Sequence, residues 1–96
     1  MPAYIIADVT VINEEQMVEY RQWSSKAMQE LGAERVVRGG AMDILEGNWS
    51  PQRVVVLRLR DRAHAKAYYD SVTYTHARSL RAGATTINMI VVDGVD

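Results

Sequence analysis

Three stretches of alternating, largely apolar residues constrain the fold of this chain more than any other feature. They span residues 3–11, 53–60 and 85–95, and they are rich in the β-branched and aromatic residues typical of strands. One set of alternating positions is wholly apolar: Ile5, Ala7, Val9, Val55, Leu57, Leu59, Ile87, Met89 and Val91. The opposite set is also rich in apolar residues: Tyr4, Ile6, Val54, Val56, Ile90 and Val92. We therefore expect a sheet with one face under helices and a second face that is too apolar for a monomer.

The segment between the first two strand-like stretches begins with a long helix pattern. Asn13 can cap a helix, and Gln16 three residues later completes a capping-box pattern. Gly32 provides a natural C-terminal stop. One stripe recurs at helical spacing and should be buried: Met17, Tyr20, Ser24, Ala27, Met28 and Leu31. The pattern predicts an amphipathic helix between Asn13 and Gly32.

Two shorter helices are expected after the strand at 53–60. Asp61 can cap the segment 62–70, Ser71 can cap the segment that follows, and Gly83 ends it. The positions expected to face the core are Ala63, Ala67, Tyr68, Tyr74 and Ala77. These two segments together fill the place of a second helix in the fold.

The middle of the chain predicts two further short strands. Residues 33–38 favour a strand, Gly39 and Gly40 permit a tight turn, and residues 41–47 are consistent with a short returning strand. The resulting order, β-α-β-(β)-β-α-β, predicts one α+β domain over residues 1–96 with a ferredoxin-like βαββαβ topology and an antiparallel sheet. Since two helices cover only one face of such a sheet, the apolar open face predicts a symmetric homodimer packed sheet on sheet.

Composition excludes several classes of protein. The chain has no cysteine and no apolar run long enough to cross a bilayer, and its first residues do not form a signal peptide, so we expect a cytoplasmic protein. The net charge of −1 and the absence of aromatics within RLRDR argue against nucleic-acid binding. No dinucleotide, phosphate-loop or HExxH motif is present, so we expect no metal and no cofactor.

Arginines and aromatics are the candidates for ligand binding. Arg38, Arg53 and Arg81 offer forked donors for a carboxylate or phosphate, although Arg38 and Arg53 could instead pair with Asp43 or Glu46. The aromatic candidates for the wall of a pocket between helices and sheet are Tyr20, Trp49 and Tyr69. The alternative is that these aromatics fill a small core or an interface.

Few residues are suited to proton transfer. His76 lies among Tyr74, Arg78 and Arg81, and Asp8 lies in the first strand, so these two are the weak catalytic candidates. His64 lies beside charged residues and is expected to be solvated. Neither histidine is placed clearly enough to predict haem binding.

Several blocks resemble the DUF1330 family of uncharacterised small proteins. They are AYIIADVTV (3–11), EYR (19–21), RGG (38–40), LEGNW (45–49), PQRVVVL (51–57), AYYDSVTY (67–74) and LRAGA (80–84). The resemblance implies a dimeric α/β barrel, in which two ferredoxin-like protomers join through their sheets. The wider superfamily includes cofactor-free monooxygenases, haem-degrading enzymes, lactone isomerases and stress-responsive proteins. Asn13 and Val72-Thr73 depart from the family pattern, at positions that cap helices.

Two functional hypotheses follow. The first is a homodimer that binds a small acidic or aromatic metabolite between helices and sheet, with cofactor-free isomerisation or oxygenation as the chemistry if it is an enzyme. The second is a non-catalytic dimerisation or stress-response module with no ligand. Fold analogy alone does not decide whether the chain is an enzyme.

Overall fold

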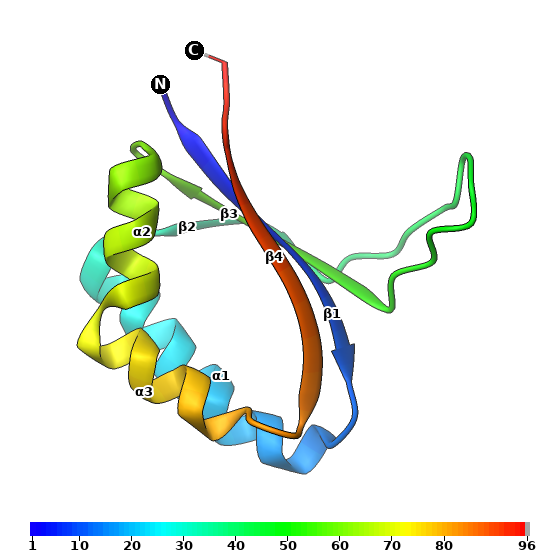
Figure 1. Ribbon diagram of the computed structural model, residues 1–96, viewed down its shortest axis with the longest axis horizontal. Helices are drawn as coiled ribbons and strands as arrows, with labels where there is room; N and C mark the ends of the chain where they lie inside the picture. The colour runs from blue at the N-terminus through cyan, green and yellow to red at the C-terminus, as the bar shows by residue number, and fades with distance from the viewer. Residues whose placement is uncertain (96) are drawn as a thin grey trace.

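The protein is a four-stranded antiparallel sheet with all of its helices on one face (Figure 1). The computed structural model describes residues 1–95. The strands are β1 (Ala3–Val11), β2 (Glu34–Arg38), β3 (Arg53–Leu59) and β4 (Thr85–Asp93), in the spatial order β2-β3-β1-β4. The helices are α1 (Glu14–Leu31), α2 (Arg62–Asp70) and α3 (Val72–Leu80). This is the ferredoxin-like βαββαβ order with the second helical position divided in two, so the predicted fold class is confirmed, although the single protomer does not close a barrel.

The strand register confirms the predicted division of the sheet into two faces. Ile5 of β1 is opposite Leu57 of β3 and Val91 of β4, and these three residues face the helices. The next residue, Ile6, is opposite Val56 and Ile90 on the open face. Since successive strand residues point to opposite faces, the register assigns every other position of the three strands to the core.

The core lies between the sheet and the helices. Tyr68 and Tyr74 are its largest fully buried side chains, both 2% exposed. The predicted stripe of α1 is confirmed, with Met17, Ala27 and Met28 buried. The predicted core positions of α2 are confirmed for Tyr68 and wrong for Ala63 and Ala67, which are exposed, while Ala65 is buried instead. The helix is rotated about its axis so that the Tyr68 ring lies in the core, and this ring buries more apolar area than the methyl groups of Ala63 and Ala67 would.

The caps of α1 fix its ends and tie it to α3. The Asn13 side chain accepts a hydrogen bond from the Gln16 backbone, and Gly32 ends the helix with a φ of 72°. The Gln16 side chain does not complete the predicted capping box. Its Nε2 instead donates to the carbonyls of Leu80 and Ala82, at 3.1 and 2.8 Å. Those carbonyls lie at the end of α3, where a helix lacks internal partners.

The segment between β2 and β3 is an exposed arm rather than a strand. Residues 41–47 carry no strand structure, so the predicted short returning strand is wrong. Strand β2 already pairs with β3, and the arm runs away from the body without a neighbouring strand to supply hydrogen bonds (Figure 1). The arm exposes several apolar side chains: Met42, Ile44, Leu45 and Trp49.

Among the described residues, no helix is both long and apolar enough to cross a membrane.

Candidate functional site

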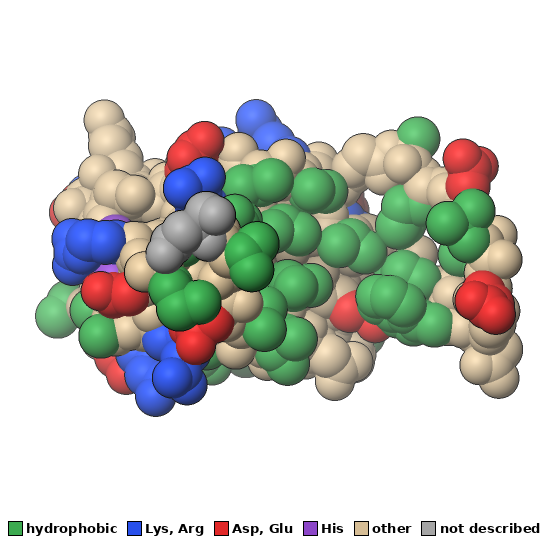
Figure 2. Space-filling view, turned by 90° about the horizontal axis from the view of Figure 1, so that it is seen from above, with side chains coloured by type: hydrophobic (Ala, Val, Ile, Leu, Met, Phe, Trp, Pro, Cys, Tyr) green, Lys and Arg blue, Asp and Glu red, His purple; other side chains and the backbone are tan. Residues whose placement is uncertain are grey.

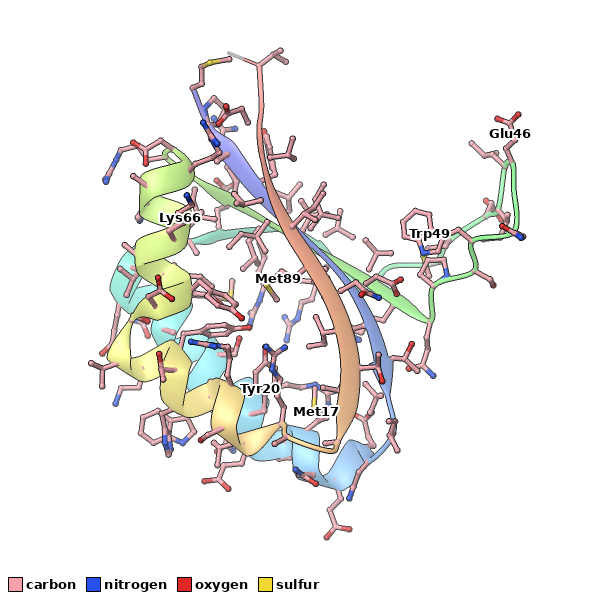
Figure 3. All side chains as sticks on the ribbon, viewed as in Figure 1. Met17, Tyr20, Glu46, Trp49, Lys66 and Met89 are labelled. Carbon is pink, nitrogen blue, oxygen red and sulfur yellow. The ribbon has the colours of Figure 1, made fainter. Side chains whose placement is uncertain are left out.

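A cavity of about 130 Å³ lies between the sheet and α1. Its sheet wall comes from the helix-facing side of β1, β3 and β4, and its opposite wall from α1 and two tyrosines of α2 and α3. Met17 and Tyr20 of α1 and Met89 of β4 point into this space (Figure 3). The apolar part of the lining is Ile5, Ala7, Val9, Val11, Met17, Met28, Val55, Leu57, Ile87 and Met89. We call this space the main cavity.

Four arginines line the main cavity: Arg21, Arg35, Arg38 and Arg53. No Asp or Glu lines it among the described residues. A β-bulge in β2 brings Arg35 and Arg38 to the same face, since the pairing with β3 shifts between Arg35 and Val37. Without that extra residue, strict alternation would send Arg35 and Arg38 to opposite faces. The bulge is therefore what concentrates positive charge at this site.

The four arginines differ in whether their guanidinium groups already have a hydrogen-bond or ion-pair partner. Arg21 forms an ion pair with Glu14, and this contact, more than any other, lowers the pKa of Glu14. Nη2 of Arg35 donates to Oγ of Ser25 at 2.7 Å. Within the described part of the chain, Arg38 and Arg53 have no carboxylate within 4 Å, so the alternative of pairing with Asp43 or Glu46 is not realised. These two guanidinium groups are therefore the ones with donors to offer an anion.

Gly39 provides the surface on which the Arg53 side chain lies. A Cβ atom on Gly39 would come within 2.7 Å of Cζ and Nη1 of Arg53. Gly39 also has a φ of 65°, a conformation that glycine adopts without steric cost. Val11, Arg21, Arg38 and Arg53 line both the main cavity and an outer hollow that opens to solvent beside Glu14 and Gln52. The arginines thus stand at the entrance to the main cavity.

A hydrogen-bonded pair of tyrosines forms part of the helical wall. The Tyr20 and Tyr74 hydroxyl oxygens are 2.9 Å apart, and the Tyr68 ring stacks on Tyr74 with centroids 4.7 Å apart. Burial raises the pKa of Tyr68 to about 12 and also raises that of Tyr74, so both rings stay neutral over the physiological range. Outside the cavity lining, the Arg81 guanidinium lies 5.4 Å from the Tyr20 ring centroid, and its buried Nη1 has no hydrogen-bond partner.

The remaining predicted residues lie elsewhere. Trp49 is 61% exposed on the arm, and its Nε1 donates to Oδ2 of Asp8 at 3.0 Å (Figure 3). Asp8 faces the open side of the sheet, opposite Val54 and Asn88. His76 is exposed and packs edge-on against Trp23, 4.5 Å between centroids. The structure therefore places the predicted proton carriers, His76 and Asp8, and the predicted aromatic Trp49 outside the main cavity.

Tyr69 lines a second cavity, of about 220 Å³, between α2 and β4. The Arg78 guanidinium lies over the Tyr69 ring, 4.1 Å from the ring centroid. His64 is not solvated as predicted, because its Nδ1 accepts from the Arg60 backbone at 3.0 Å and its Nε2 contacts the Leu31 carbonyl. His64 thus joins the start of α2 to the end of α1, which is a structural role.

The arrangement suits an anion with an apolar body. Arginines at the entrance can hold a carboxylate or an enolate oxygen with charge-assisted hydrogen bonds. A dry apolar cavity of about 150 Å³ is large enough to hold benzene, so the main cavity accommodates a group of roughly that size. In the described range, no group of three or more His, Asp or Glu side chains is placed to hold a metal ion.

Sequence reasoning identified Arg38, Arg53 and Tyr20 and expected Tyr74 to face the core, but it did not single out Arg21 or Arg35. Arg21 recurs four residues after Met17 on α1, which was a usable signal. The face of Arg35 depends on the bulge, and the partner of Tyr74 depends on how α3 packs on α1, and neither leaves a mark in the local sequence.

Solved structures similar to this chain share its fold at low sequence identity. A protein of unknown function from Rhodopseudomonas palustris is 17% identical, with a TM-score of 0.80 over 99% of this chain and 83% of that one. A protein from Nitrosomonas europaea, provisionally described as an antibiotic biosynthesis monooxygenase, is 15% identical, with a TM-score of 0.60 over 98% and 90%. A dimeric ferredoxin-like protein of unknown function from Thermobifida fusca is 14% identical, with a TM-score of 0.50 over 96% and 92%. No curated protein matches the sequence significantly.

The family assignment rests on the whole chain rather than on one motif. The model of a family described as a domain of unknown function, DUF1330, matches residues 2–95. That range contains every strand and helix of the fold and every arginine at the entrance to the main cavity. The chain belongs to the DUF1330 family.

Proposed function

We propose that this protein binds a small organic anion with an apolar or aromatic body in the main cavity. One observation carries the proposal: among the described residues, four arginines and no carboxylate line a cavity whose remaining walls are apolar residues, two tyrosines of α2 and α3, Tyr20 and two serines, Ser24 and Ser25. Arg38 and Arg53 have no carboxylate partner among the described residues. Neighbouring like charges are unfavourable unless an anion neutralises them, and guanidinium groups bind carboxylates in a forked geometry. Arg38 and Arg53 hold the charged end, and the apolar body lies against Ile5, Val55 and Tyr20.

Isothermal titration with benzoate tests this proposal, with benzyl alcohol as the uncharged probe of similar shape. Benzoate should bind and benzyl alcohol should not. Arg53→Ala should weaken benzoate binding about tenfold or more, because a hydrogen bond to a charged group contributes about 1.5–3 kcal/mol. The matched control is Arg60→Ala. Arg60 is an exposed arginine that directly follows β3, at the opposite end of the strand from Arg53, so this variant should leave binding unchanged. Benzoate binding that survives Arg38→Ala and Arg53→Ala together would contradict the proposal.

If the protein is an enzyme, the proposed chemistry is cofactor-free isomerisation or oxygenation of such an anion. Fixed guanidinium groups stabilise the negative charge that develops when a carbonyl compound enolises. The name of the Nitrosomonas europaea neighbour gives this reading some support by analogy of fold. Since His76 and Asp8 lie outside the main cavity, the Tyr20 hydroxyl is the group that we propose protonates the enolate oxygen, while a water molecule entering from the outer hollow accepts the carbon-bound proton. Exchange of the α-hydrogens of phenylpyruvate with D₂O, followed by NMR, should be slower in Tyr20→Phe than in the wild type.

We also propose that the functional form is a homodimer joined through the open face of the sheet. This face carries the apolar residues Tyr4, Ile6, Val54, Val56, Ile90 and Val92, and Ile90 is 60% exposed. Hydrophobic side chains gather there and again on the arm (Figure 2). A contiguous apolar surface of this kind is unusual for a monomer, and the Thermobifida fusca neighbour is described as dimeric.

Sedimentation velocity over a concentration series tests the dimer. We expect a dimer at micromolar concentration that Ile90→Asp converts into a folded monomer, because a buried unpaired carboxylate is costly. A stable wild-type monomer at these concentrations would contradict it. If a dimer forms but no anion binds, the alternative hypothesis of a non-catalytic dimerisation module is favoured.

A further inference from the structure

The main cavity and the second cavity are neighbours that share two wall residues. Ile5 and Met89 line both of them. The second cavity continues beyond Met89 between α2 and β4, and its other walls are Ala65, Lys66, Tyr69, Asp70, Ile90 and Val91. Figure 3 shows Met89 in the middle of the space between sheet and helices, with Lys66 on α2 beyond it. The two cavities are therefore separated only by the side chains of Ile5 and Met89, with the arginines on one side of them and α2 on the other.

Met89 is suited to act as a movable partition. It is only half-buried, and an unbranched methionine side chain with three rotatable bonds changes rotamer at little cost. Ile5, the other shared residue, is 4% exposed in the central strand and is held by pairing on both sides. A ligand that pushes between the two cavities would therefore displace Met89 rather than Ile5.

Size also argues for a joined site. Pockets that bury a whole organic ligand usually measure about 300–1,000 Å³, and the main cavity alone is about 130 Å³. The second cavity, at about 220 Å³, is the larger of the two and opens to solvent at the β4 edge of the sheet, where Lys66, Asp70 and Ile90 are exposed. Tyr69 keeps its far wall in place, because the Arg78 guanidinium stacks on that ring and its Nη2 donates to the Tyr69 carbonyl at 3.3 Å.

We propose that the ligand is an elongated amphipathic carboxylate whose apolar chain passes Met89 and ends in the second cavity. This inference rests on the proposed function, since the arginines must hold the charged end. It adds the substrate class: a medium-chain or extended aromatic acid rather than a compact one. Met89 and Ala65 then determine the length that the protein accepts, since Met89 separates the two cavities and Ala65 is a small residue, 1% exposed, on the α2 wall of the second cavity.

The test is a titration of the purified protein with linear carboxylates from butanoate to decanoate, below their micellar concentrations. Each added methylene that enters an apolar site contributes about 0.8 kcal/mol, which is about fourfold in affinity. Wild-type affinity should keep rising at chain lengths beyond those that fill the main cavity. Decanol, with a similar chain and no charge, should bind far more weakly, which separates binding in the cavity from adsorption to the apolar open face.

Two variants change the room available to a long-chain ligand, one increasing it and the other decreasing it. Met89→Ala should tighten decanoate binding several-fold relative to butanoate binding, because no side chain has to move to admit the longer chain. Ala65→Val should leave butanoate binding unchanged and weaken decanoate binding about tenfold, because it shortens the second cavity. Met28→Ala is the matched control, since Met28 lines the main cavity but not the second one. That variant should not change the preference for long chains over short ones.

The outcomes separate this inference from the proposed function. If affinity stops rising at short chains and neither Met89→Ala nor Ala65→Val alters the length profile, the joined site is wrong while anion binding stands. If Met89→Ala does not fold, the response of decanoate to Ala65→Val decides the question alone. If no carboxylate binds the wild type, or if Arg53→Ala weakens none of them, the proposed function itself fails.

Discussion

The two faces of the sheet are both rich in apolar residues but lie in opposite environments. Ile5 and Ile6 are neighbours in β1, yet Ile5 is 4% exposed beneath the helices while Ile6 lies half-buried on the open face. The helix-facing side contains the main cavity, the tyrosine pair and the arginines. The open side carries polar residues among its apolar ones, including Asp8, Arg58 and Asn88, and Trp49 of the arm donates a hydrogen bond to Asp8 there. The comparison teaches that an apolar strand face marks burial, and that only the fold shows what buries it.

Truncating the two isoleucines gives the largest expected difference between the faces. Ile5→Ala removes a core side chain and should lower the free energy of unfolding by about 2–5 kcal/mol. Ile6→Ala should cost about 1 kcal/mol in a dilute monomer, because that side chain gains less from burial. Urea denaturation at low and high protein concentration measures both. If the Ile6→Ala cost grows with concentration, a second copy buries the open face, and if both variants cost the same at low concentration, the contrast between the faces is wrong.

Alkaline pH should destabilise the helix-covered side through its buried tyrosines. The folded-state pKa of Tyr68 is raised to about 12 and that of Tyr74 is also raised, so between about pH 10 and 12 the unfolded chain loses protons that the folded protein keeps. Stability is therefore fully present below pH 10 and falls above it, by about 1.4 kcal/mol per pH unit for each such tyrosine. Denaturation curves from pH 8 to 11 should show this decline, and Tyr68→Phe should make it shallower. An unchanged slope in Tyr68→Phe would contradict the role of burial.

The hydroxyl pair on the wall of the main cavity should contribute a smaller, measurable coupling. A double-mutant cycle of Tyr20→Phe and Tyr74→Phe should give a coupling energy of about 1 kcal/mol, as expected for a largely buried hydrogen bond. Thermal or urea unfolding of the four proteins measures it. Additive effects would show that the two hydroxyls do not interact in solution.

The smallest effect is expected where the arm meets the open face. Trp49→Phe removes the hydrogen bond from Nε1 to Asp8 but keeps an aromatic ring, and the site is exposed, so the free energy of unfolding should change by less than about 0.5 kcal/mol. Asp8→Asn is the complementary variant, because an amide oxygen can still accept the bond. A loss larger than 1 kcal/mol in Trp49→Phe would show that the arm contributes to the fold of the protomer, contrary to this comparison.

Local patterns in the sequence determined most of the secondary structure. Alternation in residues 3–11, 53–60 and 85–95 defines the strands and both of their faces, since the side-chain period of a strand is two. Asn13, Gly32, Asp61 and Ser71 mark helix ends through hydrogen bonds made within a few residues, and each of these caps is present. The strand predicted at residues 41–47 did not form, because a strand needs a neighbouring strand for its backbone hydrogen bonds as well as a suitable sequence.

Tertiary structure alone decided the composition of the site. The bulge in β2 places Arg35 beside Arg38 on the helix-covered face, and the packing of α3 on α1 joins the Tyr20 and Tyr74 hydroxyls across 54 residues of sequence. In the folded chain the arm extends away from the main cavity, so Trp49 lies outside the site. Met89 lies between the main cavity and the second cavity. Residue types and periods are properties of short segments, whereas which side chains converge depends on register and packing between segments far apart in the chain.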